Sequence, residues 1–140
     1  MAQKPLWKAD PWLARLGTLR AMVALTVARL TVEFLRFNRW SGTLGRRGPG
    51  NARIPEAQAW ARHVEWAARR LPFELKCLPR AMALSWILRA KGIRHMVVFA
   101  VRPAELRNSA DALHAWVEID RMKVIGDLPG PWFETLRLGD

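Results

Sequence analysis

A length of 140 residues is enough for one domain with its own hydrophobic core, and the apolar (51%) and charged (25%) fractions are those of a globular protein. The single cysteine excludes an internal disulfide and fits a reducing compartment. The net charge of +11 favours anionic partners in general. Residues 1–50 and 51–100 carry the excess, at +7 (nine basic, two acidic) and +6 (nine and three), whereas residues 101–140 carry −2 (five and seven).

Several function classes are disfavoured by what the sequence lacks. It has no run of Lys and Arg longer than a pair, no zinc-ligand spacing and no RNA-binding signature, so we expect no nucleic-acid partner, no metal and no cofactor. The N-terminus carries no secretory signal. The most apolar run lies between Arg20 and Arg29 and has only eight residues, against the roughly 20 that span a bilayer. We therefore expect a cytoplasmic protein without stable membrane insertion.

The N-terminal third is predicted to form one long helix followed by a loop. Over residues 13–38, a polar stripe recurs every three or four residues and nearly everything else is apolar. The wide apolar face must be buried, most simply against the domain and otherwise against a partner or a membrane surface. Residues 39–53 have the glycine, proline and charge of a mobile loop, which we interpret as a linker within one domain.

Two further helices follow. Pro55 fits the first turn of a helix over about 55–70, whose apolar stripe begins at Trp60. His63 lies beside that stripe and is predicted to be an ordinary surface histidine. The next helix begins near Cys77, with Pro79 tolerated in its first turn.

The last third has the pattern of a small β-sheet. The run at 93–101 is apolar on both faces, as in a covered central strand. The run at 113–120 alternates, with His114, Trp116 and Glu118 on one face. The remaining segments are expected to be a turn at 120–122, a short strand at 123–125, a loop at 126–131 and one helical turn at 132–137.

Cys77, His114 and Asp127 form a candidate catalytic set. A thiol becomes a good nucleophile as the thiolate, which the N–H groups and dipole of a helix N-terminus stabilise. A histidine can take the thiol proton and return it to a leaving amine, and a carboxylate behind the histidine fixes its tautomer. The opposite interpretation is that a lone cysteine is a small buried hydrophobe and a lone strand histidine is structural.

The hairpin decides which carboxylate is nearest. A turn centred near residue 121 places residue 127 at the same end of the hairpin as His114. Asp120 sits at the turn end, roughly 20 Å along the strand. Asp111, three residues before the histidine, is the alternative orienter, and Glu118 shares the face of His114 but lies four residues away, beyond direct contact.

Four segments together resemble a known family. They are C-L-P-R-A-M-A-L from Cys77, L-R-A-K-G-I from Leu88, H-A-W-V-E from His114 and V-I-G-D ending at Asp127. Over about residues 55–130 the chain is similar to the lasso-peptide leader peptidases, transglutaminase-like cysteine proteases related to the C-terminal domain of the microcin J25 processing protein. Unlike many of these relatives, the chain has no glycine in the turn that follows H-A-W-V-E.

The resemblance implies an α+β fold of transglutaminase and papain type, with N-terminal helices and a small antiparallel sheet packed against the cysteine-bearing helix. It implies one peptidase domain over 1–140, with an N-terminal helix and linker at 1–53 and a catalytic core at 54–140. Carried over by position, Cys77 is the nucleophile, His114 the acid and base, and Asp127 its orienter. The backbone N–H of Cys77 is a candidate oxyanion donor.

The implied activity is removal of the leader from a ribosomally made precursor peptide, before an asparagine-synthetase-like cyclase closes the lasso ring. In this family a small domain, fused or separate, recognises the leader. Residues 1–50 hold one helix and a loop, so we expect a separate recognition protein as partner, docked on helix 13–38 or on the basic N-terminal half. Two alternatives stay open: a transglutaminase-like acyl transferase or amidase with the same triad, and a catalytically inactive basic docking protein.

Overall fold

Three long helices precede the sheet in the described part of the chain. In the computed structural model, which describes residues 11–46, 51–103, 113–126 and 130–139, these are α2 (Pro11–Phe34), α4 (Ile54–Arg70) and α5 (Cys77–Ala90). The predicted helix at 13–38 ends early, because Arg36 is extended (φ −75°, ψ 150°) and starts the short α3 (Phe37–Trp40). α4 carries its proline in the first turn, where no backbone N–H is needed.

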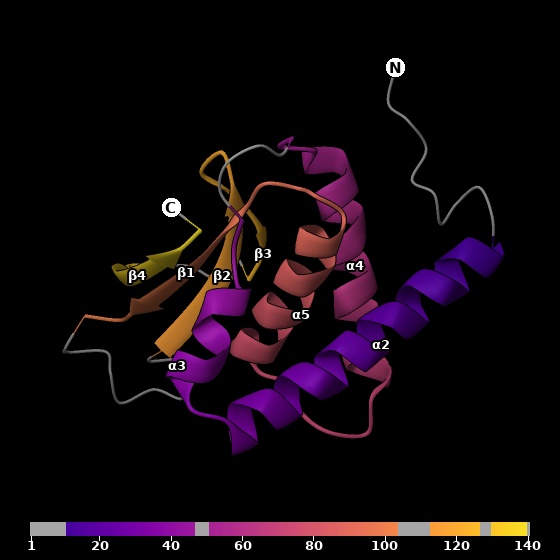
Figure 1. Ribbon diagram of the computed structural model, residues 1–140, viewed down its shortest axis with the longest axis horizontal. Coiled ribbons are helices and arrows are strands. Elements are labelled where there is room, and N and C mark those ends of the chain that lie inside the picture. The colour runs from indigo at the N-terminus through magenta and orange to yellow at the C-terminus, as the bar shows by residue number, and fades with distance from the viewer. Residues whose placement is uncertain (1–10, 47–50, 104–112, 127–129, 140) are drawn as a thin grey trace.

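The helices and the sheet form layers. Helix α2 crosses α4 and α5 on one side, and α5 packs on the sheet on its other side (Figure 1). Four strands make the sheet in the order β3-β2-β1-β4, and each neighbouring pair is antiparallel. Their bounds are β1 Met96–Val101, β2 Leu113–Ile119, β3 Met122–Ile125 and β4 Phe133–Leu138. The main core therefore lies between α2, α4, α5 and the inner face of the sheet.

The C-terminal strand corrects a sequence prediction. The segment expected to form one helical turn at 132–137 is instead β4, which pairs with β1 from Val101↔Phe133 to Val97↔Leu138. The cause is the second edge of β1: its buried backbone groups need hydrogen-bond partners on both sides, and β2 satisfies only one side. Figure 1 shows β4 as the outer strand beside β1.

The segment expected to be a mobile linker is anchored to the rest of the domain at several of its described positions. Leu44 is buried, the Gly45 N–H donates to Ser85 Oγ (2.9 Å), and the backbone of Arg46 pairs with that of His95. Gly45 has φ +77°, and a Cβ there would lie 2.3 Å from the Leu138 carbonyl oxygen. This close crossing of two chain segments requires glycine.

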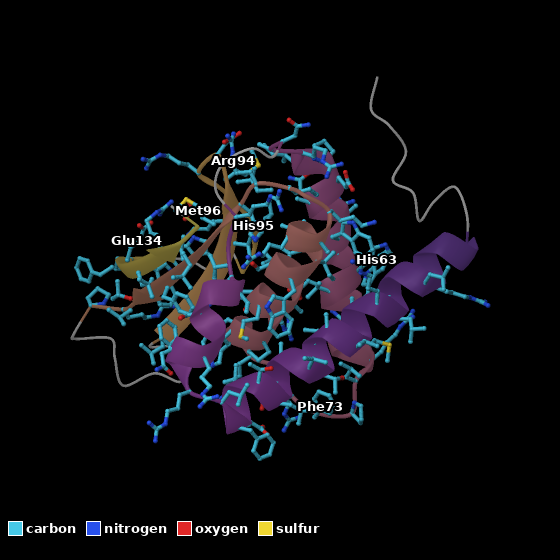
Figure 2. All side chains as sticks on the ribbon, viewed as in Figure 1. His63, Phe73, Arg94, His95, Met96 and Glu134 are labelled. Carbon is cyan, nitrogen blue, oxygen red and sulfur yellow. The ribbon has the colours of Figure 1, made fainter. Side chains whose placement is uncertain are left out.

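His95 is a structural residue. Its Nδ1 donates to the Ile93 carbonyl (2.8 Å) and its Nε2 accepts from Ser85 Oγ (2.7 Å), which in turn accepts from Gly45. Burial lowers the pKa of His95 to about 4, against the raising effect of the Ile93 carbonyl. The neutral imidazole thus lies just before the first residue of β1, between Gly45 of the linker segment and Ser85 of α5 (Figure 2).

His63 was predicted to lie on the surface, and that prediction is wrong. It is buried between α4 and α2, where its Nδ1 lies 3.3 Å from the Thr18 hydroxyl (Figure 2). The contact is possible because α2 presents Gly17 to the imidazole ring: a Cβ there would come within 2.9 Å of it. Burial lowers the pKa of His63.

Helix α2 buries only a narrow stripe of its apolar surface. Ala21, Leu25 and Ala28 are fully buried, whereas large side chains on the other face stay exposed. The exposed face, which we term the α2 stripe, consists of Leu16, Leu19, Val23, Val27, Leu30 and Phe34. The expectation that the whole apolar face packs against the domain is therefore met in part. None of the described helices is both long and apolar enough to cross a membrane.

Candidate active site

Cys77 is the first residue of α5. Lys76 before it is extended (φ −79°, ψ −177°), and Pro79 occupies the first turn, where its missing N–H costs no hydrogen bond. The rest of the helix is fixed by a buried apolar surface that includes Met82 and Leu84. The thiol therefore sits at the positive end of a rigid, core-packed helix.

Arg80 ties the chain before the thiol to α4. Its Nε donates to the Leu75 carbonyl (3.0 Å), and its Nη1 pairs with Glu65 on α4 at 2.7 Å. Both side chains are about one-third exposed, at 32% each. Arg80 belongs to the C-L-P-R segment that opens α5, and its two contacts hold the start of this helix, with Cys77, against α4.

The Cys77 thiol is half-buried against strand β2. Burial raises its pKa, against the lowering effect of backbone hydrogen bonds from Ala115, Leu78 and Cys77 itself and of the positive charge of Arg80. The helix N-terminus was expected to favour the thiolate. It does act in that direction, but the effect of desolvation on the pKa is larger.

His114 is buried on β2, next in the chain to Ala115, and its ring is held between aromatic groups. It stacks on Trp132 (centroids 5.1 Å apart, 27° between planes) and contacts Trp116 at 5.8 Å. Its Nε2 is hydrogen-bonded to the Gly126 carbonyl. Because a carbonyl can only accept, Nε2 carries the proton, which leaves Nδ1 as the basic nitrogen of the neutral ring.

The other residues of H-A-W-V-E support this histidine. Trp116 donates its indole N–H to Glu118 Oε2 (2.6 Å), and Glu118 Oε1 lies 3.4 Å from Arg137 on β4. The predicted alternation is confirmed, since His114, Trp116 and Glu118 form one row. Glu118 contacts the tryptophan and not the imidazole, as its distance along the strand indicated.

The β2–β3 hairpin brings Gly126 to His114. Its turn is at Asp120 and Arg121, both with positive φ (49° and 65°), and a bulge after Val117 shifts the register by one residue. Gly126 itself has φ +80°, and a Cβ there would lie 2.9 Å from the Ala115 carbonyl oxygen. Only glycine fits this approach.

The candidate carboxylates fall in different places. Asp127 and Asp111 both lie outside the described residues. Asp120 lies at the turn, the far end of the hairpin, where it is 3.7 Å from Arg94. The described part of the site thus contains the thiol and the imidazole, together with the carbonyl of the residue before Asp127.

Cys77 and His114 share two cavities, and no hydrogen bond joins their side chains, both of which are described. One cavity, of about 680 Å³, lies between α4 and β3, and the other, of about 310 Å³, lies against β1 and β4. Within the described ranges, no cluster of three or more His, Cys, Asp or Glu side chains is placed to hold a metal ion.

These observations define an α+β domain in which the only cysteine of the chain begins a helix that packs beside a histidine-bearing strand. The sequence model of the transglutaminase-like superfamily matches residues 21–136, most of the chain, and the chain belongs to this superfamily. Its members are typically Cys-His-Asp enzymes. No curated protein and no solved structure matches the chain. The predicted α+β, transglutaminase-like fold is confirmed.

Proposed function

We propose that this chain is a cysteine peptidase that removes the leader from a ribosomally made lasso-peptide precursor before ring closure. The observation that carries the proposal is the half-buried Cys77 thiol at a helix N-terminus, where it shares both cavities with His114. Superfamily membership supports cysteine acyl chemistry in general. The four motif segments described above support the leader peptide as substrate.

The chemistry follows from the tautomer of His114. Nδ1 takes the thiol proton, the thiolate attacks the scissile carbonyl carbon, and an S–C bond forms. The C–N bond then breaks, and the imidazolium returns its proton to the amine of the departing core peptide. Water, deprotonated by the same imidazole, hydrolyses the thioester and leaves the leader with a free carboxylate and Cys77 as a thiol.

Asp127 is proposed to orient the imidazole. It directly follows Gly126, whose carbonyl accepts the Nε2 proton of His114. A carboxylate at that nitrogen would stabilise the imidazolium formed when the thiol is deprotonated. Burial raises the pKa of Cys77. The reaction therefore depends more strongly on proton transfer from the thiol to His114 than it would with a preformed thiolate.

Leader cleavage by purified variants tests the triad. We expect Cys77→Ala to abolish cleavage with the fold intact, His114→Ala to match it, and Asp127→Ala to be milder but still severe. Cleavage retained by Cys77→Ala would refute the proposal. A larger loss in Asp120→Ala or Asp111→Ala than in Asp127→Ala would assign the orienting role elsewhere.

Two other functions are separated by direct measurements. Mass analysis of the product distinguishes hydrolysis, which leaves a free carboxylate, from acyl transfer, which leaves an isopeptide. Alkylation of Cys77 by iodoacetamide distinguishes an enzyme from an inactive docking protein. Rapid, His114-dependent alkylation near neutral pH marks a functional thiol, and an inert thiol marks a scaffold.

A separate leader-recognition protein is proposed to dock on the α2 stripe, and the processed core is proposed to pass to an asparagine-synthetase-like cyclase. The stripe leaves six large apolar side chains exposed on one helix face, and it continues into a groove of about 450 Å³ beside Trp86 and Ile87 on α5. The net charge of +7 on residues 1–50 favours a partner with an acidic rim around its apolar contact.

Affinity for the purified recognition protein tests this surface. Val23 is 58% exposed at the centre of the stripe, so Val23→Glu is expected to weaken binding at least tenfold. Arg36→Gln, an exposed change outside the stripe, is the matched control and is expected to change affinity less than threefold. Equal affinities of the wild type and Val23→Glu would place the partner on another surface.

A further inference from the structure

Two cavities of opposite character meet at the reacting groups. Cys77 and His114 line both the cavity between α4 and β3 and the one against β1 and β4. A peptide whose scissile bond lies over the thiol must extend away from it in two directions, and these cavities are the hollows available on either side. Their linings therefore bear on which side chains the peptide carries.

The larger cavity is basic. Of the described residues that line it, four are Arg or Lys and one is acidic: Arg62, Arg69, Arg80, Lys123 and Glu65. Glu65 is engaged with Arg80 at 2.7 Å, and the described charged side chains of the lining, four basic and one acidic, sum to a positive charge. A partly enclosed cluster of one sign attracts ligands of the opposite charge, and Arg forms strong hydrogen bonds with carboxylates.

The smaller cavity is apolar. Apart from the reacting pair and Thr135, its side chains are Phe37, Leu78, Phe99, Ala100, Val101, Leu113, Ala115 and Leu136. Phe37 and Phe99 meet edge to face at 5.9 Å. Leu113 is 72% exposed and Leu136 is 38% exposed. An apolar side chain entering this cavity would remove these exposed surfaces from water.

We propose that Cys77 acts on a peptide that places an apolar side chain in the cavity against β1 and β4 and acidic side chains in the cavity between α4 and β3. This inference rests on the proposed function, because an unreactive Cys77 would make neither cavity a substrate site. It adds the chemical class of the sequence on each side of the scissile bond.

Synthetic peptides with a central vinyl sulfone provide the probes. The Cys77 thiol adds across the double bond: an S–C bond forms, the proton taken by His114 passes to the neighbouring carbon, and no group leaves. One probe carries leucine on one side of the electrophile and two glutamates on the other, and a second carries them in reverse order. Comparison probes replace the glutamates by lysines or the leucine by serine.

Intact-protein mass spectrometry gives the rate of Cys77 modification. In one of the two orders, the Glu–Leu probe is expected to react at least tenfold faster than its lysine and serine counterparts. Arg69→Glu should remove the preference for glutamate, whereas Arg70→Glu, exposed on the same helical turn but outside the cavity, should keep it. Leu113→Lys should remove the preference for leucine, with Leu30→Lys on the α2 stripe as its control.

The outcomes separate this inference from the proposed function. Equal rates for all probes, with modification still dependent on His114, overturn the inference and leave the peptidase standing. A preference that persists in Arg69→Glu or in Leu113→Lys overturns the assignment of the corresponding cavity. Modification that is no faster than that of an unfolded-chain thiol and is unchanged by His114→Ala refutes the proposed function itself.

Discussion

The buried histidine at the base of β1 makes the stability of the fold sensitive to acid. His95 is 1% exposed, and both of its ring nitrogens are used, one as donor to Ile93 and one as acceptor from Ser85. Protonation would turn Nε2 of His95 from an acceptor into a donor, and it would then face the hydroxyl hydrogen of Ser85, which now donates to it. The perturbation we consider is a fall in pH, compared between the wild type and His95→Asn, which cannot titrate.

The magnitude follows from the two pKa values. The folded-state pKa of about 4 lies below the ordinary value of 6.5, so the unfolded chain binds the proton more readily. The contribution of His95 is therefore fully present above pH 6.5 and is lost as the pH falls toward 4. At about 1.4 kcal/mol per pH unit, the loss is on the order of 1 kcal/mol at pH 5.5 and about 3 kcal/mol at pH 4.

Denaturant unfolding at a series of pH values measures this effect. Carboxylates titrate in the same range, so the quantity of interest is the difference in unfolding free energy between the wild type and His95→Asn. That difference should shift by about 3 kcal/mol in favour of the variant from pH 7.5 to pH 4. An NMR titration of the folded wild type is independent of variant stability. A His95 ring that protonates near pH 6.5 would refute the reasoning.

Three further changes test the site. Gly126→Ala brings a Cβ to 2.9 Å from the Ala115 carbonyl oxygen at φ +80°, so we expect a loss of about 2 kcal/mol in unfolding free energy and slower Cys77 alkylation, both measured on purified protein. Arg80→Ala removes a charge that lowers the Cys77 pKa, so the pH profile of alkylation should move to higher pH, while an unchanged profile would remove Arg80 from the site. Trp116→Phe deletes the indole N–H donor to a buried carboxylate and should cost about 1–3 kcal/mol in a denaturant titration.

The sequence predicted the elements whose signals are local. Pro55 and the apolar stripe place α4 within a residue of its observed start, and the Cys77 helix begins where expected. Strands β1 and β2 follow from a doubly apolar run and from an alternating one. For α4 and β2 the local side-chain periodicity, and for α5 and β1 the continuous apolar run, favour the same structure as the tertiary packing.

The failures arise where a distant segment decides the outcome. β4 has no periodicity of its own strong enough to identify it and forms because β1 has an open edge. His63 is buried because α2 crosses it at Gly17. The raised pKa of the Cys77 thiol depends on how deeply α5 packs against β2, which no helix-terminus rule supplies.

The period of two in H-A-W-V-E gives His114 and Ala115 different surroundings on the two faces of β2. On one face, Trp116 contacts the ring of His114 and is itself held by a hydrogen bond to Glu118. On the opposite face, Ala115 is small and 2% exposed, and it lines a cavity together with Cys77. A larger side chain at that position would hold the helix N-terminus away from the strand. One face of β2 therefore orients the imidazole of His114, and the other leaves room for the start of α5.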